Sequence, residues 1–409
     1  MEMFQTLPVN PRSWADVREI VPEAAGRTVL VRGWAQALRR VNKLYCISRS
    51  ENQLPFNFED AARTCEESSK DSQTVKKLAR VSLDTRLNNR AFDLRTPVNQ
   101  AIFKLQNEVD STFRRILLAR GFLGIHTPKL TAGISEGGSA VFSLSYLNGQ
   151  AASLAQSPQL YKQMAINGGL KRVFEVGTVF RAEKSNTHRH LCEYIGIHVE
   201  LEIQEHYFEI CDLCGSLFVK LFDHLSENCG EELKVINEQY PSEPLKYLKE
   251  TLKLKCSDGI EMLKASGFAI NYLDDLNSQA EKRLGQIVRE RFHTDFYILY
   301  EYPLEVRPFY TVPCVENRQY SNSFDAFIRG EEVVSGSQRI HHHDKLVRRI
   351  EECGIDPSTL KGFTDSFRYG APPRGGFGAG LERVVMLYCG LPDIRNASLF
   401  PRDPHRLEP

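Results

Sequence analysis

The chain has 409 residues with 52 acidic and 52 basic side chains, so its formal net charge at pH 7 is zero. This length is too great for one ordinary core and predicts two domains. An apolar content of 42% and a charged content of 25% are typical of a soluble globular protein. No apolar run approaches the ~18 residues of a membrane-spanning helix. Neutrality leaves a nucleic-acid partner open, because basic patches can lie on a neutral chain.

The N-terminal stretch MEMFQTLPVNPRSW lacks the basic and then apolar order of a secretion signal. The ten cysteines are therefore expected to be free thiols in a reducing cytoplasm. Cys211 and Cys214 form one CxxC inside a helix-like apolar pattern, which favours core packing over zinc. Three adjacent histidines, 341–343, cannot all face one metal ion from a single helix or strand, and we expect them at the start of a helix.

Two short strands are predicted near the N-terminus, at 27–38 and 43–48. Because two strands alone are marginal in water, residues 1–53 are interpreted as the remnant of a small β domain. The polar, charged stretch 54–96 is interpreted as a hinge with helical turns. A second domain, 97–409, then begins with a strongly amphipathic helix.

After that helix, 122–130 is expected to be extended and is interrupted by Pro128. The string SEGGSAVF, which includes Glu136, predicts either an ordinary connection or a lid that closes over a small cationic substrate. In LAQSPQLYKQM a strand end runs into a helix, and Gln159 and Lys162 share one helix face. That face is either an exposed surface or part of a site.

Period-two patterning predicts a hairpin with strands at 173–180 and 194–201. The loop between them, 181–190, is rich in Arg, Lys and His. It is either a solvated hairpin or a phosphate site, because a strand end would hold the guanidinium of Arg181 rigidly.

The next predicted elements are helices at 206–226, 257–267 and 281–292, and strands at 296–300 and 308–313. The string SFDAFIRGEEVVSGSQR, residues 323–339, predicts a strand, a turn at Gly330 and a second strand. On it, Glu332 and Ser335 offer oxygen ligands for magnesium, unless they are surface groups beside a tight turn.

The string RGGFGAGLERVVMLYCG combines glycines with a helix that begins near Leu381 and carries Arg383 in its first turn. Glycines allow a backbone to approach a ligand closely, and a glycine-rich entry to a helix favours phosphate. It matches neither GxGxxG nor GxxxxGK[ST], which argues against a Rossmann or Walker-type site.

Six strings in order, SEGGSAVF, AQSPQLYKQ, FRAEKSNTHRH, GEEVVSGSQR, GAGLERVVM and SLFPRDP, resemble the motifs of class II aminoacyl-tRNA synthetases over residues 54–409. Within subclass IIb they resemble the aspartyl-tRNA synthetases of the eukaryotic and archaeal type. The resemblance implies an α+β fold, with an antiparallel sheet flanked by helices in the domain that carries motifs 1, 2 and 3, and an N-terminal OB-type β-barrel. It implies activation of L-aspartate with ATP and Mg²⁺ to aspartyl-adenylate and pyrophosphate, and transfer to the 3′ end of tRNA(Asp) by a cytoplasmic homodimer.

The resemblance also implies residue roles. Arg181, at the α-phosphate and substrate carboxylate, and Arg383, at the γ-phosphate, are the expected catalytic residues. Glu332 and Ser335 would carry magnesium, with Asp325 behind them. The expected ATP-binding residues are Arg181, Glu183, His190, Tyr194, Glu332 and Arg383, with Glu183 and Tyr194 at the adenine and His190 near the triphosphate.

By the same resemblance, the aspartate-binding residues would be Glu136, Gln159, Lys162, Arg181, Ser335 and Arg339, and Pro128 would lie at the dimer interface. Lys162 and Arg339 would meet the side-chain carboxylate, whereas Gln159 and Glu136 would meet the α-amino group. An amide substrate would leave the buried cations unpaired, at a cost of ~1–3 kcal/mol or more.

Two features depart from the family pattern. His198 stands where the family commonly has an acidic residue. The middle strands of the barrel are absent between VRGWAQALRR and VNKLYCISRS, so no anticodon-reading residue is assigned. Two other hypotheses therefore stay open: a binding or regulatory paralogue that does not charge tRNA, and an amino-acid ligase that acts without tRNA.

Overall fold

The computed structural model describes residues 53–63, 80–132 and 141–408. The chain divides into two compact units, 1–54 and 55–409, and nearly all the described residues belong to the second unit. The predicted strands at 27–38 and 43–48 and the expected barrel lie outside the described residues, as does Glu136.

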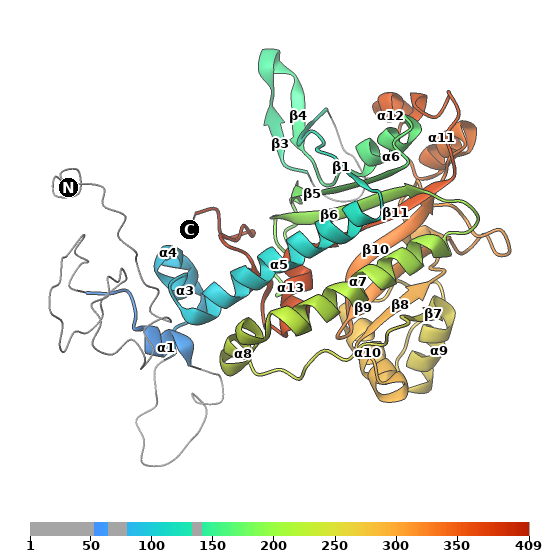
Figure 1. Ribbon diagram of the computed structural model, residues 1–409. Coiled ribbons are helices and arrows are strands. Elements are labelled where there is room, and N and C mark those ends of the chain that lie inside the picture. Colours follow the sequence, from blue (N-terminus) through green and yellow to red (C-terminus); the bar gives the residue numbers. More distant parts are fainter. Residues whose placement is uncertain (1–52, 64–79, 133–140, 409) are drawn as a thin grey trace. The chain divides into compact units, whose positions relative to one another are not determined.

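A large mixed sheet forms the centre of the second unit, with the strand order β1-β5-β6-β11-β10-β9-β8-β7 (Figure 1). The inner neighbours pair antiparallel, whereas the edge strands β1 and β7 run parallel to β5 and β8. A smaller sheet has the order β2-β4-β3. The strands are β1 Leu123–Gly124, β2 Leu130–Thr131, β3 Ser143–Ser145, β4 Ala151–Leu154, β5 Arg172–Phe180, β6 Glu193–Glu202, β7 Leu252–Lys255, β8 Phe296–Tyr300, β9 Ser323–Ile328, β10 Glu331–Arg339 and β11 Arg374–Gly380.

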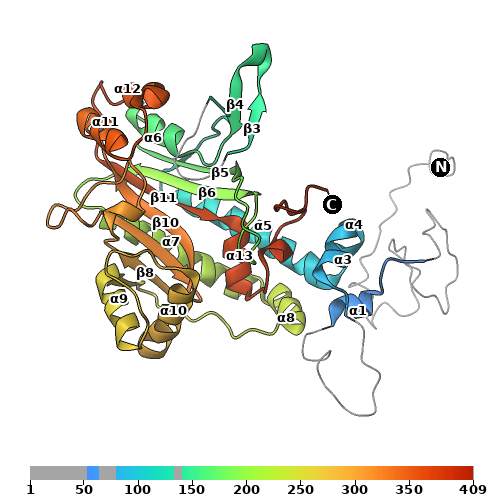
Figure 2. The same ribbon diagram turned by 180° about the vertical axis from the view of Figure 1, so that it is seen from behind.

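Helices lie on both faces of the large sheet (Figures 1 and 2). They are α1 Phe58–Ala62, α3 Leu83–Asn88, α4 Arg90–Asp93, α5 Pro97–Ala119, α6 Gln159–Asn167, α7 Phe208–Asn228, α8 Gly230–Gln239, α9 Cys256–Ala265, α10 Ser278–Phe292, α11 His343–Glu352, α12 Lys361–Asp365 and α13 Leu381–Cys389. Short 3₁₀ turns are η4 Leu147–Gly149, η5 Leu304–Val306, η6 Pro357–Leu360 and η7 Ile394–Ala397. Within the described ranges, no helix has both the length and the apolar content needed to cross a bilayer.

The two faces of the sheet differ because side chains alternate along each strand. On one face, apolar residues of the inner strands join α5, α7 and α13 in the largest hydrophobic core. On the other face, α9 and α10 cover the β7–β8 end through a second core. A third core joins α11 and α12 with residues of α6. We call this second face, between these two helical groups, the site face.

Several sequence predictions are confirmed. The helix after Pro97, the charged hairpin β5–β6 and the strand–turn–strand β9–β10 are present. Cys211 and Cys214 are buried in the core side of α7, and the cysteines of the described ranges are free thiols. The three adjacent histidines stand at the start of α11.

One prediction is wrong. Residues 308–313 do not form a strand, because only isolated bridges at Thr311 and Pro313 link them to neighbours. The glycines of RGGFGAG form a central strand, β11, between β6 and β10, and this strand leads directly into the predicted helix at Leu381. Close packing explains them, since a Cβ on Gly376 would lie 2.0 Å from the carbonyl oxygen of Val199.

Candidate functional site

Glycines of two neighbouring strands line the middle of the site face, which we call the floor. Gly196 of β6 pairs with Gly380 of β11, and Gly376 and Gly378 continue the same face. Neighbouring side chains lie against three of these glycines, His198 over Gly196 and Gly378 and Glu200 over Gly376. Polar and charged side chains surround this floor at two ends, which we call the amino-acid end and the phosphate end.

At the amino-acid end, two cations share one buried carboxylate. Lys162 Nζ of α6 lies 3.2 Å from Glu200 Oε2, and Arg339 Nε of β10 donates to Glu200 Oε1 at 3.2 Å. The relative exposures of Lys162, Arg339 and Glu200 are 2%, 4% and 0%. Burial alone would raise the pKa of Glu200, but Arg339 and Lys162 outweigh it and hold this pKa below its usual value. The structure therefore brings the two predicted cations together, with an anion that the sequence reasoning missed.

His198 lies on the floor itself, over Gly196 and Gly378. A Cβ on Gly196 would lie 2.4 Å from its Nε2, and one on Gly378 would lie 2.8 Å from its Nδ1. Burial, followed by the charges of Lys162 and Arg181, lowers the pKa of His198 well below its usual value, so the imidazole is neutral at pH 7. Its Nε2 is buried and has no hydrogen-bond partner within the described residues.

Gln159 stands one helical turn before Lys162 on α6. Its side chain is buried, and its Nε2 has no partner in the part of the chain that the structure describes. An unmet buried donor costs free energy, so this position suits a polar group of a ligand. Glu136, its predicted companion, lies outside the described residues.

At the phosphate end, Arg181 directly follows the last residue of β5. Its Nη1 lies 3.9 Å from Glu183 Oε1, and its guanidinium carbon lies 5.9 Å from the ring centre of Tyr194. The three side chains are half-buried, and Tyr194 and Gly380 lie on the same face because Tyr194 contacts the Cβ position of Gly380. An aromatic ring beside a solvent-accessible cation can bind a nucleotide, with the ring stacked on the nucleobase and the cation paired with the phosphate.

Arg383 approaches the same end from α13. Its Nη2 donates to the carbonyl oxygen of Arg189 at 2.9 Å, and its Nη1 donates to that of Glu332 at 3.3 Å. His190 lies close to this group, since burial and then Arg383, Arg189 and Arg181 lower its pKa to about 4. The hairpin loop and α13 thus place several cations near one another, as a polyphosphate requires.

Beside Arg383, β9 and β10 present oxygen atoms. Burial, with the neighbouring charge of Asp325, raises the pKa of Glu332 to about 7. Arg307 donates to both oxygens of Asp325, at 3.0 and 2.6 Å, and to Ser335 Oγ at 3.1 Å. A divalent cation would relieve the repulsion that Glu332 experiences, so this donor set fits magnesium.

The protein supplies only part of a coordination shell there. Among the described residues, no group of three or more His, Cys, Asp or Glu side chains is arranged to hold a metal ion. A magnesium ion at Glu332 and Ser335 would therefore need phosphate oxygens and water as further ligands, which is its usual behaviour with nucleotides.

Sequence reasoning missed Glu200, Arg307 and Arg189. Glu200 could have been found, because it continues the alternation of Gly196 and His198 against apolar neighbours and so faces the site. Arg307 and Arg189 gave no such signal, since their partners Asp325 and Glu281 are far away in the sequence.

Pro128 is exposed, near the edge strand β1. Leu123 and Leu130 beside it are 51% and 48% exposed.

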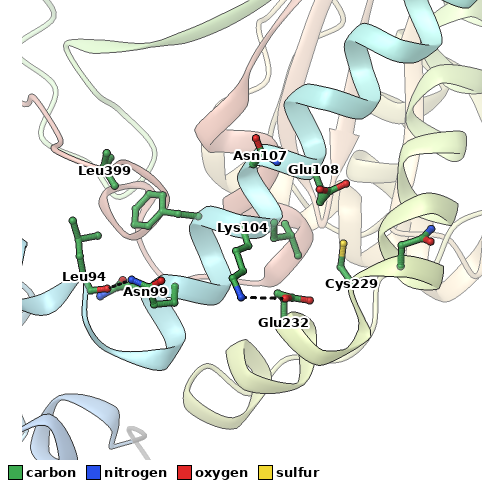
Figure 3. Close-up of a pocket in the computed structure, with 12 residues that line it drawn as sticks. Leu94, Asn99, Lys104, Asn107, Glu108, Cys229, Glu232 and Leu399 are labelled. Carbon is green, nitrogen blue, oxygen red and sulfur yellow. Dashed lines mark hydrogen bonds and ion pairs between the residues drawn. The ribbon is translucent and has the colours of Figure 1, made fainter. Parts of the chain in front are cut away.

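A separate groove of about 550 Å³ lies along α5 near the C-terminal segment (Figure 3). Asn99 and Leu399 line it, and its described lining has one cation, Lys104, which lies 3.9 Å from Glu232. This groove lacks the paired cations and glycine floor of the site face. We therefore place the candidate site on the sheet.

Comparison with known proteins agrees with this geometry. Residues 82–404 match the family model of class II tRNA synthetases (D, K and N). The chain is 59% identical over 370 residues to aspartate–tRNA ligase 2, cytoplasmic, of Arabidopsis thaliana, covering 90% of this chain and 66% of that protein. It is 47% identical over 369 residues to the cytoplasmic aspartate–tRNA ligase of Homo sapiens, covering 90% and 72%.

A solved structure, the aspartyl-tRNA synthetase of Entamoeba histolytica, superposes with a TM-score of 0.80 at 46% identity, covering 89% of this chain and 72% of that one. The chain thus spans about two thirds of the length of the curated relatives that it matches. The chain therefore belongs to the class II tRNA synthetases of the D, K and N group, and over about nine tenths of its length it is similar to aspartate–tRNA ligases.

Proposed function

We propose that this chain is a cytoplasmic aspartate–tRNA ligase. It activates L-aspartate with ATP to aspartyl-adenylate and pyrophosphate, and then transfers aspartate to the 3′ end of tRNA(Asp). The observation that carries the proposal is the pair of buried cations, Lys162 and Arg339, at one end of a glycine floor whose other end carries Arg181 and Arg383. Relatives 47–59% identical to the chain carry this activity in their names.

In the first step, the α-carboxylate oxygen of aspartate attacks the α-phosphorus of ATP. The bond between this phosphorus and the bridging oxygen breaks, and pyrophosphate leaves. The nucleophile is already ionised, so no general base is required and the protein acts by positioning and charge stabilisation. Arg181 stabilises the α-phosphate and the substrate carboxylate, and Arg383 holds the γ-phosphate.

The remaining ATP contacts follow from the same arrangement. Tyr194 stacks on the adenine, Glu183 accepts a hydrogen bond from its amino group, and His190 lies beside the triphosphate as a neutral imidazole. Glu332 and Ser335 hold a magnesium ion, with Asp325 adding negative charge behind them. The ion supplies neutralisation of phosphate charge when it is bound.

Selection of aspartate follows from charge. Lys162, Glu200 and Arg339 together carry a net charge of +1 (two cations and one anion). The side-chain carboxylate of aspartate brings this to zero, whereas the amide of asparagine leaves a buried positive charge uncompensated. Gln159 and Glu136 meet the α-amino group.

In the second step, the terminal hydroxyl of tRNA(Asp) attacks the carbonyl carbon of the adenylate, and AMP leaves. Ser335, at the phosphate end, is exposed to solvent. The exposed apolar edge around Pro128 supports assembly as a homodimer.

The test is pyrophosphate exchange with ATP and aspartate, asparagine or lysine in parallel, followed by tRNA charging on the same preparation. We expect exchange with aspartate alone and charging of tRNA(Asp). Exchange without charging, together with amide formation from ammonia, would favour a ligase that acts without tRNA. Absence of exchange with all three amino acids would favour a non-catalytic paralogue.

A further inference from the structure

Among the described residues, the guanidinium of Arg383 is held by backbone carbonyls rather than by a carboxylate. Its two donors reach the carbonyl oxygens of Arg189, in the hairpin loop, and Glu332, on β10, at 2.9 and 3.3 Å. The direction of this guanidinium therefore depends on where those two residues are fixed. Neither carbonyl can be altered by side-chain substitution, so whatever anchors the two residues controls Arg383.

One side chain anchors both residues. Glu281, in the first turn of α10, is only 3% exposed. Its Oε2 accepts from Arg189 Nη1 at 2.7 Å and from the backbone nitrogen of Glu332 at 3.2 Å, and its Oε1 accepts from Arg189 Nη2 at 3.3 Å. Glu281, Arg189, Arg383 and Glu332 thus form a closed ring of hydrogen bonds from four separate elements.

Backbone packing between α10 and the β9–β10 turn fixes how far Glu281 lies from β10. A Cβ on Gly285 of α10 would lie 2.4 Å from the Cα of Gly330, so the helix rests directly on the β9–β10 turn. Gly330 has a φ of 74°, which favours glycine. Helix and turn are in contact without intervening side chains, so the Glu281 carboxylate has a defined distance to β10.

We propose that Glu281 is a positioning residue for ATP: it aims Arg383 at the phosphates by fixing the hairpin loop and β10 with one carboxylate. The proposal rests on the proposed function in taking Arg383 as a phosphate ligand. Glu281 itself makes no contact with substrate. Its substitution therefore affects ATP and leaves the amino-acid end, which uses other elements, unchanged.

The variant Glu281→Gln keeps the shape and removes the charge. Calorimetric titration with ATP and magnesium, without aspartate, should show about tenfold weaker binding, as the loss of about 1.4 kcal/mol would produce. In exchange assays the KM for ATP should rise similarly, whereas the KM for aspartate should stay within about twofold. Glu290→Gln, an exposed glutamate on the same helix, is the matched control and should leave both values unchanged.

A double-mutant cycle distinguishes positioning from general damage. In an Arg383→Ala background, Glu281→Gln should cost less than about a further twofold in kcat/KM for ATP, because its effect passes through Arg383. Arg189→Ala breaks the same ion pair from the loop side and should weaken ATP binding in the same way. It serves as the test if Glu281→Gln folds poorly.

Additive losses in the cycle, an equal rise of the aspartate KM, or wild-type ATP affinity in Glu281→Gln and Arg189→Ala would each overturn the inference. Its failure is separable from that of the proposed function. If the wild-type protein binds ATP but shows no pyrophosphate exchange with aspartate, the proposed ligase function is overturned. The effect of Glu281 on ATP affinity would still stand.

Discussion

The two ends of the candidate site hold their charges in different environments. At the amino-acid end, Lys162, Glu200 and Arg339 are buried and contact one another through their side chains. At the phosphate end, the Arg181–Glu183 pair is separated by 3.9 Å, and the two side chains are 36% and 32% exposed. Arg383, at the same end, is held by backbone carbonyls.

This difference matches what each end has to recognise. A small anion that must be told apart from its amide is selected best by fixed charges shielded from water, where interactions are strong. A large polyanion that must enter and leave is bound better by partly solvated cations, since water and salt weaken each contact. The comparison predicts that substitutions at the buried end affect stability, whereas those at the open end affect turnover.

The largest expected effect is on stability at the buried end. Glu200→Gln removes the anion between two buried cations and should lower the free energy of unfolding by about 3–5 kcal/mol, as breaking a buried pair does. Urea denaturation, monitored by circular dichroism, measures this loss of unfolding free energy. Glu183→Gln is the matched control, because its partly exposed pair should contribute less than about 1 kcal/mol. Similar losses in the two variants would remove the distinction between the ends.

The second effect is on turnover at the open end. Arg181→Ala should lower aspartate-dependent pyrophosphate exchange by about 10²–10³-fold, the usual result of removing one group that stabilises transition-state charge. Its melting temperature should stay near that of the wild type, because the side chain is partly solvated. Unchanged exchange in this variant would contradict the role of Arg181.

The third prediction compares two buried glutamates. Glu382 accepts from the backbone nitrogen of Ile195, and burial raises its pKa to about 7, whereas the cations hold the pKa of Glu200 below its usual value. Folded Glu382 binds its proton more tightly than the unfolded chain, in which the pKa is 4.5. Its contribution to stability is therefore complete below pH 4.5 and is lost as the pH rises through about 7.

Glu382→Gln should remove this loss, which amounts to at most about 3 kcal/mol between these two pH values. Urea denaturation at a series of pH values measures it against the wild type. A stability profile with the same slope in both proteins would show that Glu382 does not titrate in this range.

The smallest effect is expected at the boundary between the two ends. His198→Asp places a carboxylate on the floor near Lys162 and Arg181, and it would also attract the α-ammonium group of the substrate. We expect the KM for aspartate to fall by about three- to tenfold, with the KM for ATP unchanged. A rise in the aspartate KM would instead mean that the neutral imidazole itself binds the substrate.

Sequence patterns predicted the elements whose signals are local. The helix after Pro97, the β5–β6 hairpin and the strand–turn–strand at β9–β10 follow from periodicity and turn residues. Residues 308–313 were mistaken for a strand, because a short apolar run does not show whether a neighbour will pair with it along its length. The strand formed by the glycines of β11 was not predicted, since glycine is rare inside strands and its reason here is the close approach of β6.

By itself, the sequence determined the helix and strand periods, the order of the motifs and the kinds of charge available for a site, because these depend on neighbouring residues alone. Only the tertiary structure decided that Glu200 lies between Lys162 and Arg339, that β11 provides the floor and that Glu281 holds the loop beside Arg383. These contacts join residues far apart in the chain. Their geometry exists only once the sheet has set its register and the helices have packed on its faces.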